Sequence, residues 1–219
     1  MQIIEKLAIP GEHSLLLQGI IGKLEAVLTV PDQNDSGFIA FLGHPHSLQG
    51  GTMNNKVVTT LARVFKDLGI PSLRFNFRGV GQSEGAYDAG QGESEDMLAL
   101  ARELQKEQPE KKLIFAGFSF GSYVAYRAAA QVHAHLLISI APPIHHYNYH
   151  EFNPAPFPWI IVQGEEDEVV PPALVFDFAA QLDPEVPVIR FANTSHFFHG
   201  KLIELKTKLS EYITAQVVL

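Results

Sequence analysis

Ser119 lies between two glycines in the stretch GFSFG, residues 117–121. The apolar run Leu113–Ala116 before it is typical of a strand, and the residues after it suit a helix that begins near Phe120. Such an abrupt turn holds its central residue in a strained conformation and requires small neighbours. It presents the serine hydroxyl at the end of a sheet and leaves the backbone N–H of Phe120 free for a developing oxyanion. The pattern predicts a nucleophilic serine, although GxSxG also arises by chance.

A serine nucleophile needs a base, and the base needs an acid that orients it. Candidate acids follow the strand-like run Trp159–Val162, in the loop QGEEDEVVPP. Its four carboxylates belong to Glu165, Glu166, Asp167 and Glu168. One of them can turn inward toward a histidine. The alternative is a solvated acidic loop, with Asp167 near the start of a helix.

Candidate bases follow the strand expected at Val186–Phe191, in the stretch ANTSHFFHG with His196 and His199. A histidine in such a loop is often merely exposed. Here, however, two strand-end loops supply acid and base in the chain order Ser, Asp/Glu, His that accompanies a serine turn of this type. The three segments together predict nucleophilic catalysis more strongly than any one of them.

The loop after the expected strand Gly37–Leu42 reads GHPHSLQGGTMNNK. Its glycines let the backbone approach a ligand, so we expect a second oxyanion donor here. His44 and His46 form an H-x-H pair that could instead ligate a metal, but no third ligand with matching placement is evident. The histidines of a later loop are also potential metal ligands, but a polar surface loop is the better account of them; they are His145, His146 and His150.

Short apolar runs alternate with helix-compatible segments along most of the chain. Strands are expected at Gly37–Leu42, Ser72–Phe77, Leu113–Ala116, Leu136–Ile140, Trp159–Val162 and Val186–Phe191. Helices are expected at Asn54–Leu68, Glu93–Gln108, Gly121–Val132, Ala173–Leu182 and Lys201–Val217. At the N-terminus, antiparallel edge strands are expected at Ile3–Ile9, Ser14–Gln18 and Leu24–Val30. This alternation predicts βαβ units in a mostly parallel α/β sheet.

Composition narrows the class of partner. The chain has 219 residues, of which 46% are hydrophobic and 18% charged, with a net charge of −8. That length and composition suit a single domain over residues 1–219. An acidic chain without basic clusters is a poor candidate for binding nucleic acid or an anionic membrane. With no cysteine, thiolate catalysis and disulfides are excluded. No signal-type or membrane-spanning run is evident, so we expect a cytoplasmic protein.

Five blocks spread over residues 43–202 resemble the α/β-hydrolase superfamily: GHPHSLQGGTMNNKVV, LRFNFRGVGQSEG, GFSFGSY, QGEEDEVVPP and SHFFHGKL. The chain is most similar to small bacterial hydrolases of that superfamily, near dienelactone hydrolase-like and serine aminopeptidase-like esterases. The resemblance implies a sheet of about eight strands with helices on both faces. It also implies a minimal lid, because the lid position, residues 141–157, is short and rich in proline, histidine and aromatic residues.

Carried over residue by residue, the resemblance implies that Ser119 is the nucleophile, Asp167 the acid and His196 the base. Phe120 and His46 would supply the backbone N–H groups of the oxyanion hole. Pro45 departs from the glycine common at that place, and the cysteine nucleophile of dienelactone hydrolases has no counterpart here. The implied activity is hydrolysis of a small ester-type substrate through an acyl-enzyme, without metal or organic cofactor.

Several alternatives remain open at this stage. The same catalytic residues serve acyltransferases, thioesterases and amidases, and a non-catalytic binding protein can use the same fold. The glycines of RFNFRGVGQSEG, residues 74–85, resemble a dinucleotide loop, but an acidic, turn-rich stretch follows them instead of a helix. Aromatic residues at the lid position could wall an acyl pocket or simply pack that loop down; they are Tyr147, Tyr149, Phe152 and Phe157. The sequence does not decide between a monomer and a homodimer.

Overall fold

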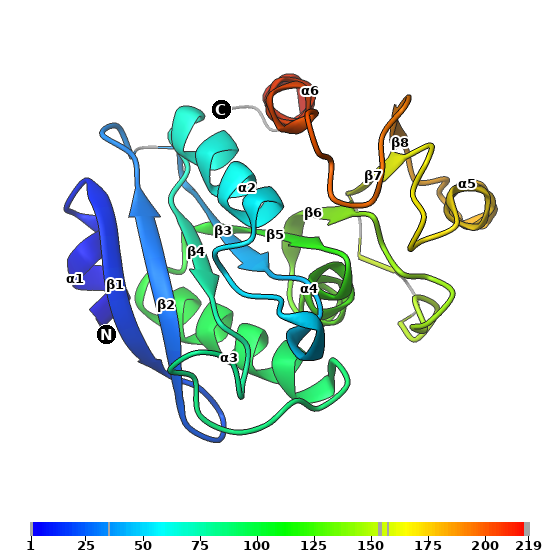
Figure 1. Cartoon of the computed structure of the whole chain (residues 1–219). Helices are drawn as coiled ribbons and strands as arrows, with labels where there is room; N and C mark the ends of the chain where they lie inside the picture. The colour runs from blue at the N-terminus through cyan, green and yellow to red at the C-terminus, as the bar shows by residue number, and fades with distance from the viewer. Residues whose placement is uncertain (1, 35, 153–154, 157, 217–219) are drawn as a thin grey trace.

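An eight-stranded sheet forms the centre of the computed structural model, which describes residues 2–34, 36–152, 155–156 and 158–216 (Figure 1). The strands are β1 (Gly11–Gln18), β2 (Lys23–Val30), β3 (Phe38–Gly43), β4 (Ser72–Phe75), β5 (Lys112–Phe118), β6 (Ala134–Ile140), β7 (Trp159–Gly164) and β8 (Val188–Phe191). The α-helices are α1 (Gln2–Leu7), α2 (Lys56–Asp67), α3 (Gln91–Glu107), α4 (Phe120–Ala129), α5 (Pro172–Gln181) and α6 (Leu202–Gln216), and a 3₁₀ turn spans Ser47–Gln49. The α/β prediction of a mostly parallel sheet is confirmed.

The strands lie in the order β1-β2-β4-β3-β5-β6-β7-β8. From β4 to β8 every neighbouring pair is parallel, whereas β2 runs antiparallel to both β1 and β4. The antiparallel N-terminal edge was expected. The strand predicted at Ile3–Ile9 is wrong, because residues 2–7 form helix α1. Ile3 and Leu7 are one helical turn apart, and both are buried against the edge of the core.

Each central strand is apolar on both of its sides because helices cover both faces of the sheet. In β5, Leu113 and Phe115 pack in the cluster that includes α3 and α4. Ile114 and Ala116 of the same strand pack in the cluster that includes α2 and α6. Figure 1 shows α2 and α6 on one side of the sheet and α3 on the other.

The five expected helices all form, with ends that shift by a few residues. Val217, the last residue of the helix predicted at 201–217, lies outside the described residues. At the lid position, the described residues 141–152 and 155–156 form turns and bends, with no α-helix. Phe157 also lies outside the described residues. Within the described chain, none of the helices has both the length and the apolar character needed to span a bilayer.

The strand order reverses at β3, and this reversal creates the place for a site. The chain passes from β3 to β4 on one side and later returns to add β5 on the other side. The carboxyl ends of β3 and β5 are therefore neighbours, and the loops that follow them leave the sheet in different directions. In open α/β sheets, ligands bind in the crevice that such a reversal opens.

Candidate active site

The turn between β5 and α4 holds Ser119 in a conformation that few residues adopt. Its φ is 53° and its ψ is −125°, in a region that costs a residue other than glycine about 1–3 kcal/mol. The Ser119 N–H donates to the carbonyl of Ile140 at 2.8 Å, and the Ser119 carbonyl accepts from the Ser122 hydroxyl at 2.6 Å. These bonds hold the strained residue in place at the start of the helix.

Three glycines allow the turn to close. A Cβ on Gly117 would overlap the carbonyl of Gly121, and a Cβ on Gly121 would overlap the backbone of Gly43. The end of β3 therefore lies directly against the first turn of α4. The strand, strained serine and helix predicted from GFSFG are all present in the structure.

Ser119, His196 and Asp167 form one chain of hydrogen bonds. The Ser119 Oγ lies 3.1 Å from His196 Nε2, and His196 Nδ1 lies 2.9 Å from Asp167 Oδ2. A carboxylate only accepts, so Nδ1 carries the proton and Nε2 accepts from the serine hydroxyl. The loops after β5, β7 and β8 thus bring together the three residues that the sequence predicts as nucleophile, acid and base.

Asp167 is buried, and both of its carboxylate oxygens accept hydrogen bonds, so it is not a solvated acid. Its Oδ1 accepts the backbone N–H groups of Val169 and Val170 at 2.9 and 2.7 Å, and its Oδ2 also accepts from Gln163 Nε2 at 3.0 Å. Burial alone would raise the pKa of Asp167. The hydrogen bonds from His196 and from the two backbone N–H groups outweigh burial and hold that pKa below its ordinary value. Asp167 is therefore ionised at neutral pH.

The predicted oxyanion residues lie beside Ser119. Phe120 is the first residue of α4, where the backbone N–H has no partner within the helix. His46 lines the same cleft as Ser119 and His196. Its Nδ1 accepts the Leu48 N–H at 3.3 Å, so its Nε2 is the donor to the Tyr87 hydroxyl at 3.1 Å. The His46 ring is thereby held between the backbone of Leu48 and the side chain of Tyr87.

His44 uses both ring nitrogens within the protein, which argues against the H-x-H metal alternative. Its Nδ1 donates to the Pro45 carbonyl at 2.7 Å, and its Nε2 accepts the Phe77 N–H at 2.9 Å. Burial lowers the pKa of His44 to about 4, although the bond to Pro45 opposes that shift. Neutral His44 therefore ties the loop after β3 to the end of β4.

The cleft over Ser119 is small, with a volume of about 230 Å³. One wall is backbone and polar, and it comes from the loop after β3. The other wall carries Val169 and Phe197, which are 44% and 42% exposed. The Phe197 ring contacts the rings of Phe118 and His196 at centroid distances of 6.1 and 5.1 Å, so it is held beside the histidine.

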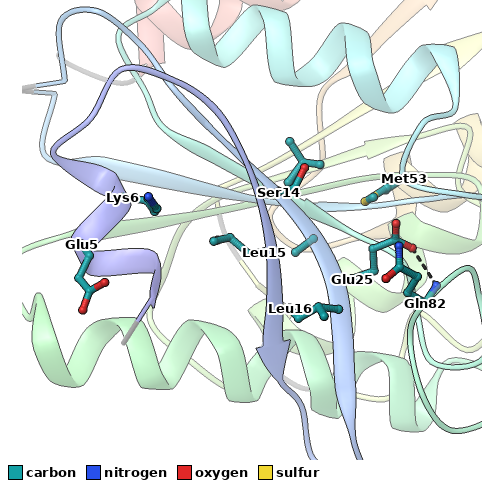
Figure 2. A pocket seen from close by; sticks show the side chains of 10 residues that line it. Glu5, Lys6, Ser14, Leu15, Leu16, Glu25, Met53 and Gln82 are labelled. Atoms are coloured by element: carbon teal, nitrogen blue, oxygen red, sulfur yellow. Dashed lines mark hydrogen bonds between the residues drawn. The ribbon is translucent and has the colours of Figure 1, made fainter.

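A wider groove of about 630 Å³ lies on the antiparallel edge (Figure 2). It runs over β1 and β2, from Glu5 and Lys6 of α1 to Met53 and Gln82. None of the predicted catalytic residues lines it. Its polar groups include Glu25, whose carboxylate already accepts the Gln82 N–H at 2.9 Å. The groove lacks an acid–base–nucleophile arrangement and is not a candidate active site.

The other motifs of the sequence have structural explanations. The glycines of residues 74–85 occupy turns with positive φ, and α3 begins only at Gln91, so a helix does not follow the loop directly. Buried Arg78 pairs there with buried Asp96 at 2.8 Å. The three histidines of the later loop are all exposed; they are His145, His146 and His150. Among the residues that the structure describes, no group of three or more His, Asp or Glu side chains could hold a metal ion.

Comparison with known proteins agrees with this geometry. A family model described as an alpha/beta hydrolase domain matches residues 46–216. The chain belongs to the α/β hydrolase family. The uncharacterized protein RP471 of Rickettsia prowazekii is 35% identical to it over 185 residues, 80% of this chain and 78% of the relative.

Two solved structures are similar to this α/β hydrolase over nearly its whole length. XC6422 of Xanthomonas campestris, described as an α/β serine hydrolase without a lid, is 41% identical, with a TM-score of 0.89 over 94% of this chain and 95% of the other. An α-β serine hydrolase homologue from Coxiella burnetii is 43% identical, with a TM-score of 0.88 over 92% of this chain and 97% of the other. The resemblance inferred from the five sequence blocks is confirmed.

Sequence reasoning missed several contacts that hold the site together. Gln163 contacts Asp167, Tyr87 contacts His46, and the carboxylate of Glu168 accepts the backbone N–H of His196 at 3.1 Å. The position of Gln163 at the end of β7, directly before the acidic loop, was the one available signal. The contacts of Tyr87 join segments 41 residues apart, and nothing in the local sequence indicates them.

We expect His44 to make stability depend on pH. Its folded pKa of about 4 is below the ordinary value of 6.5, so the unfolded chain takes up the proton first as the pH falls. Folded-state stability should therefore decrease between about pH 6.5 and pH 4, by about 3 kcal/mol from this group. Urea unfolding of wild type and His44→Gln across that range measures the difference. The same pH dependence in both proteins would contradict this assignment.

Proposed function

We propose that this α/β hydrolase is a serine hydrolase that cleaves an ester-type carbonyl substrate through an acyl-enzyme. The observation that carries the proposal is the unbroken hydrogen-bond chain from Asp167 through His196 to Ser119. Nucleophilic serine catalysis requires these three groups in contact and in this order. The strained turn at Ser119 supports the same role, since it exposes the hydroxyl toward the cleft.

In the proposed first half-reaction, His196 Nε2 takes the proton of Ser119 as Oγ attacks the substrate carbonyl. Asp167 holds the imidazole in the tautomer that can accept this proton, and its charge stabilises the imidazolium that forms. We assign the backbone N–H groups of Phe120 and His46 to the oxyanion. Collapse of the tetrahedral intermediate expels the alcohol, which takes the proton from His196.

In the second half-reaction, water enters the open cleft and loses a proton to His196 as its oxygen attacks the acyl carbonyl. The second tetrahedral intermediate releases the acid and returns the proton to Ser119 Oγ. Each step uses only the three side chains and the oxyanion donors, so the proposal requires no metal or organic cofactor.

The lid position supports an open site. Tyr149 is completely buried, and its hydroxyl bonds to the Ser122 hydroxyl at 2.8 Å. Phe152 packs on Tyr126, with its ring 5.9 Å away. These aromatic side chains hold the loop down on α4 and do not line the cleft. Tyr147 is only partly buried and lies against Phe120 at 5.6 Å. With no helix in the described part of this loop, the substrate reaches Ser119 directly.

The apolar wall narrows the substrate class. Val169 and Phe197 are each within two residues of a proposed catalytic group, and both line the cleft. Exposed apolar side chains that gather around a polar site mark a binding surface. We therefore propose a substrate with a small apolar group beside the scissile bond.

Ser119→Ala is the direct test of the nucleophile. Intact-mass spectrometry after reaction with a fluorophosphonate should show one adduct on the wild type and none on the variant. Circular dichroism should show that the variant folds, because the substitution removes only the hydroxyl group. Ester hydrolysis retained by Ser119→Ala would contradict the assignment. A well-folded wild-type protein that forms no adduct would favour a binding role instead.

Asp167→Asn tests the acid, with Glu166→Gln as its matched control in the same loop. The amide holds the histidine in the wrong tautomer, so kcat should fall roughly 10⁴-fold. Glu166 is exposed, and Glu166→Gln should leave kcat within about twofold, since surface substitutions of this kind change little. Steady-state kinetics on one activated ester measures both variants. The reverse ranking would move the acid to Glu166.

Phe197→Ser tests the apolar wall. The ratio of kcat/KM between longer and shorter substrates should fall, because each buried methylene contributes about 0.8 kcal/mol, or roughly fourfold. Two ester series are needed, one that varies the acyl chain and one that varies the alcohol. Ile203→Ser is the control, since Ile203 is 85% exposed on α6 and does not line this cleft. Unchanged ratios in both series would show that Phe197 does not contact the substrate.

A further inference from the structure

Two neighbouring carboxylates of the loop after β7 bind the same histidine. Asp167 Oδ2 accepts the ring Nδ1–H of His196 at 2.9 Å. Glu168 Oε2 accepts the backbone N–H of His196 at 3.1 Å. The imidazole is therefore held at its ring by one residue and at its main chain by the next.

The main-chain contact limits a movement of the His196 backbone that the ring contact alone allows. A hydrogen bond to Nδ1 still allows the ring to rotate about the Nδ1–Oδ2 line if the backbone of His196 moves. That rotation would carry Nε2 away from Ser119 Oγ, which lies 3.1 Å away. Anchoring the His196 N–H fixes the point from which the side chain projects. Misplacement of a reacting group by about 1 Å can cost about 10²-fold in rate.

The short loop that carries His196 needs such an anchor. Asn193 has a φ of 49° and Phe198 a φ of 54°, so left-handed residues lie on both sides of the histidine. The loops after β7 and β8 are also joined by the Glu166 N–H, which donates to the Thr194 carbonyl at 3.1 Å. This second link is a backbone bond that no side-chain substitution removes. Glu168 adds the side-chain link at the histidine itself.

Glu168 also differs from the other exposed acids of its loop. Glu165, Glu166 and Glu168 are all exposed, but within the described chain only the Glu168 carboxylate receives a hydrogen bond from the candidate site. Because Glu168 remains in contact with solvent, its carboxylate forms this bond without a large desolvation cost. Hydrogen bonds to a charged partner are also stronger than neutral ones.

We propose that Glu168 is a positioning residue that fixes the backbone of His196 and so holds Nε2 within reach of Ser119. This inference rests on the proposed function, because it assigns Glu168 an effect on the same reaction. Glu168 does not line the cleft, and the proposed role involves no proton transfer. It acts through a hydrogen bond that requires an acceptor oxygen but no negative charge.

The test compares Glu168→Ala, Glu168→Gln and Glu166→Ala in activated-ester kinetics and in the rate of fluorophosphonate labelling. Glu168→Ala should lower kcat and the labelling rate about tenfold, with little change in KM, because the hydrogen bond that holds the His196 backbone is lost. Glu168→Gln should restore most of the rate, since its amide oxygen accepts the same N–H. Glu166→Ala should match the wild type.

A salt series separates the hydrogen bond from a simple charge effect. If only the negative charge mattered, Glu168→Gln and Glu168→Ala would be equally slow, and salt would slow the wild type toward them. That result would overturn the proposal. Glu168→Ala activity within twofold of the wild type would overturn it as well.

Amide hydrogen exchange at His196, followed by NMR, tests the anchor without relying on activity. The His196 amide should be protected in the wild type and in Glu168→Gln, and should exchange faster in Glu168→Ala. Equal protection in all three proteins would refute the positioning role even if the enzyme is active. If the exchange result holds but the wild type forms no fluorophosphonate adduct, the anchor stands and the proposed serine hydrolase function fails.

Discussion

The close contact between the end of β3 and the first turn of α4 is the constraint on which the site depends. Gly43, Gly117 and Gly121 meet backbone to backbone there, with no room for a Cβ at any of the three. Only this approach lets β5 turn into α4 at a single strained residue. Ser119 is consequently presented over the sheet with the loop after β3 beside it, and the rest of the cleft is arranged around that turn.

Asp167 and His196 reach Ser119 because the carboxyl ends of parallel strands, and the loops that follow them, lie at one edge of the sheet. β7 and β8 lie two and three strands away from β5 in the sheet order. Asp167 and His196 must therefore extend back across that edge, and the cross-loop hydrogen bonds keep them there. The backbone link from Glu166 to Thr194 and the Glu168 contact join the two loops before either reaches the serine. Polar contacts between these loops therefore hold the site together.

The buried polar groups near the site differ in whether they carry a charge. Asp167 keeps its charge because backbone N–H groups and two side chains donate to it. His44, in the loop after β3, stays neutral because burial disfavours the cation and because its Nε2 accepts the Phe77 N–H. One histidine thus supports the loop structurally, while His196 has its Nε2 directed at a hydroxyl. Residue type alone does not distinguish these two roles.

Much of the fold could be predicted, because apolar runs and glycine-containing turns are local signals. The βαβ order, the turn at Ser119 and the acidic and histidine loops all follow from patterns within about ten residues. The error at Ile3–Ile9 shows the limit of such signals. Its apolar spacing suits a strand or a helix, and the choice depended on burial of Ile3 and Leu7 beside an edge that β1 already occupies.

The sequence by itself determined the fold class and the candidate nucleophile, because the strand–serine–helix pattern restricts the conformation locally, and the family resemblance pointed to Asp167 and His196. The tertiary structure alone showed that Asp167 contacts the His196 ring, that Tyr149 packs the lid loop down, and that Gln163 and Glu168 bond to Asp167 and His196. The physical reason is distance along the chain. Hydrogen bonds such as that between His196 and Glu168 join residues 28 positions apart, and only the folded sheet brings their loops to the same edge.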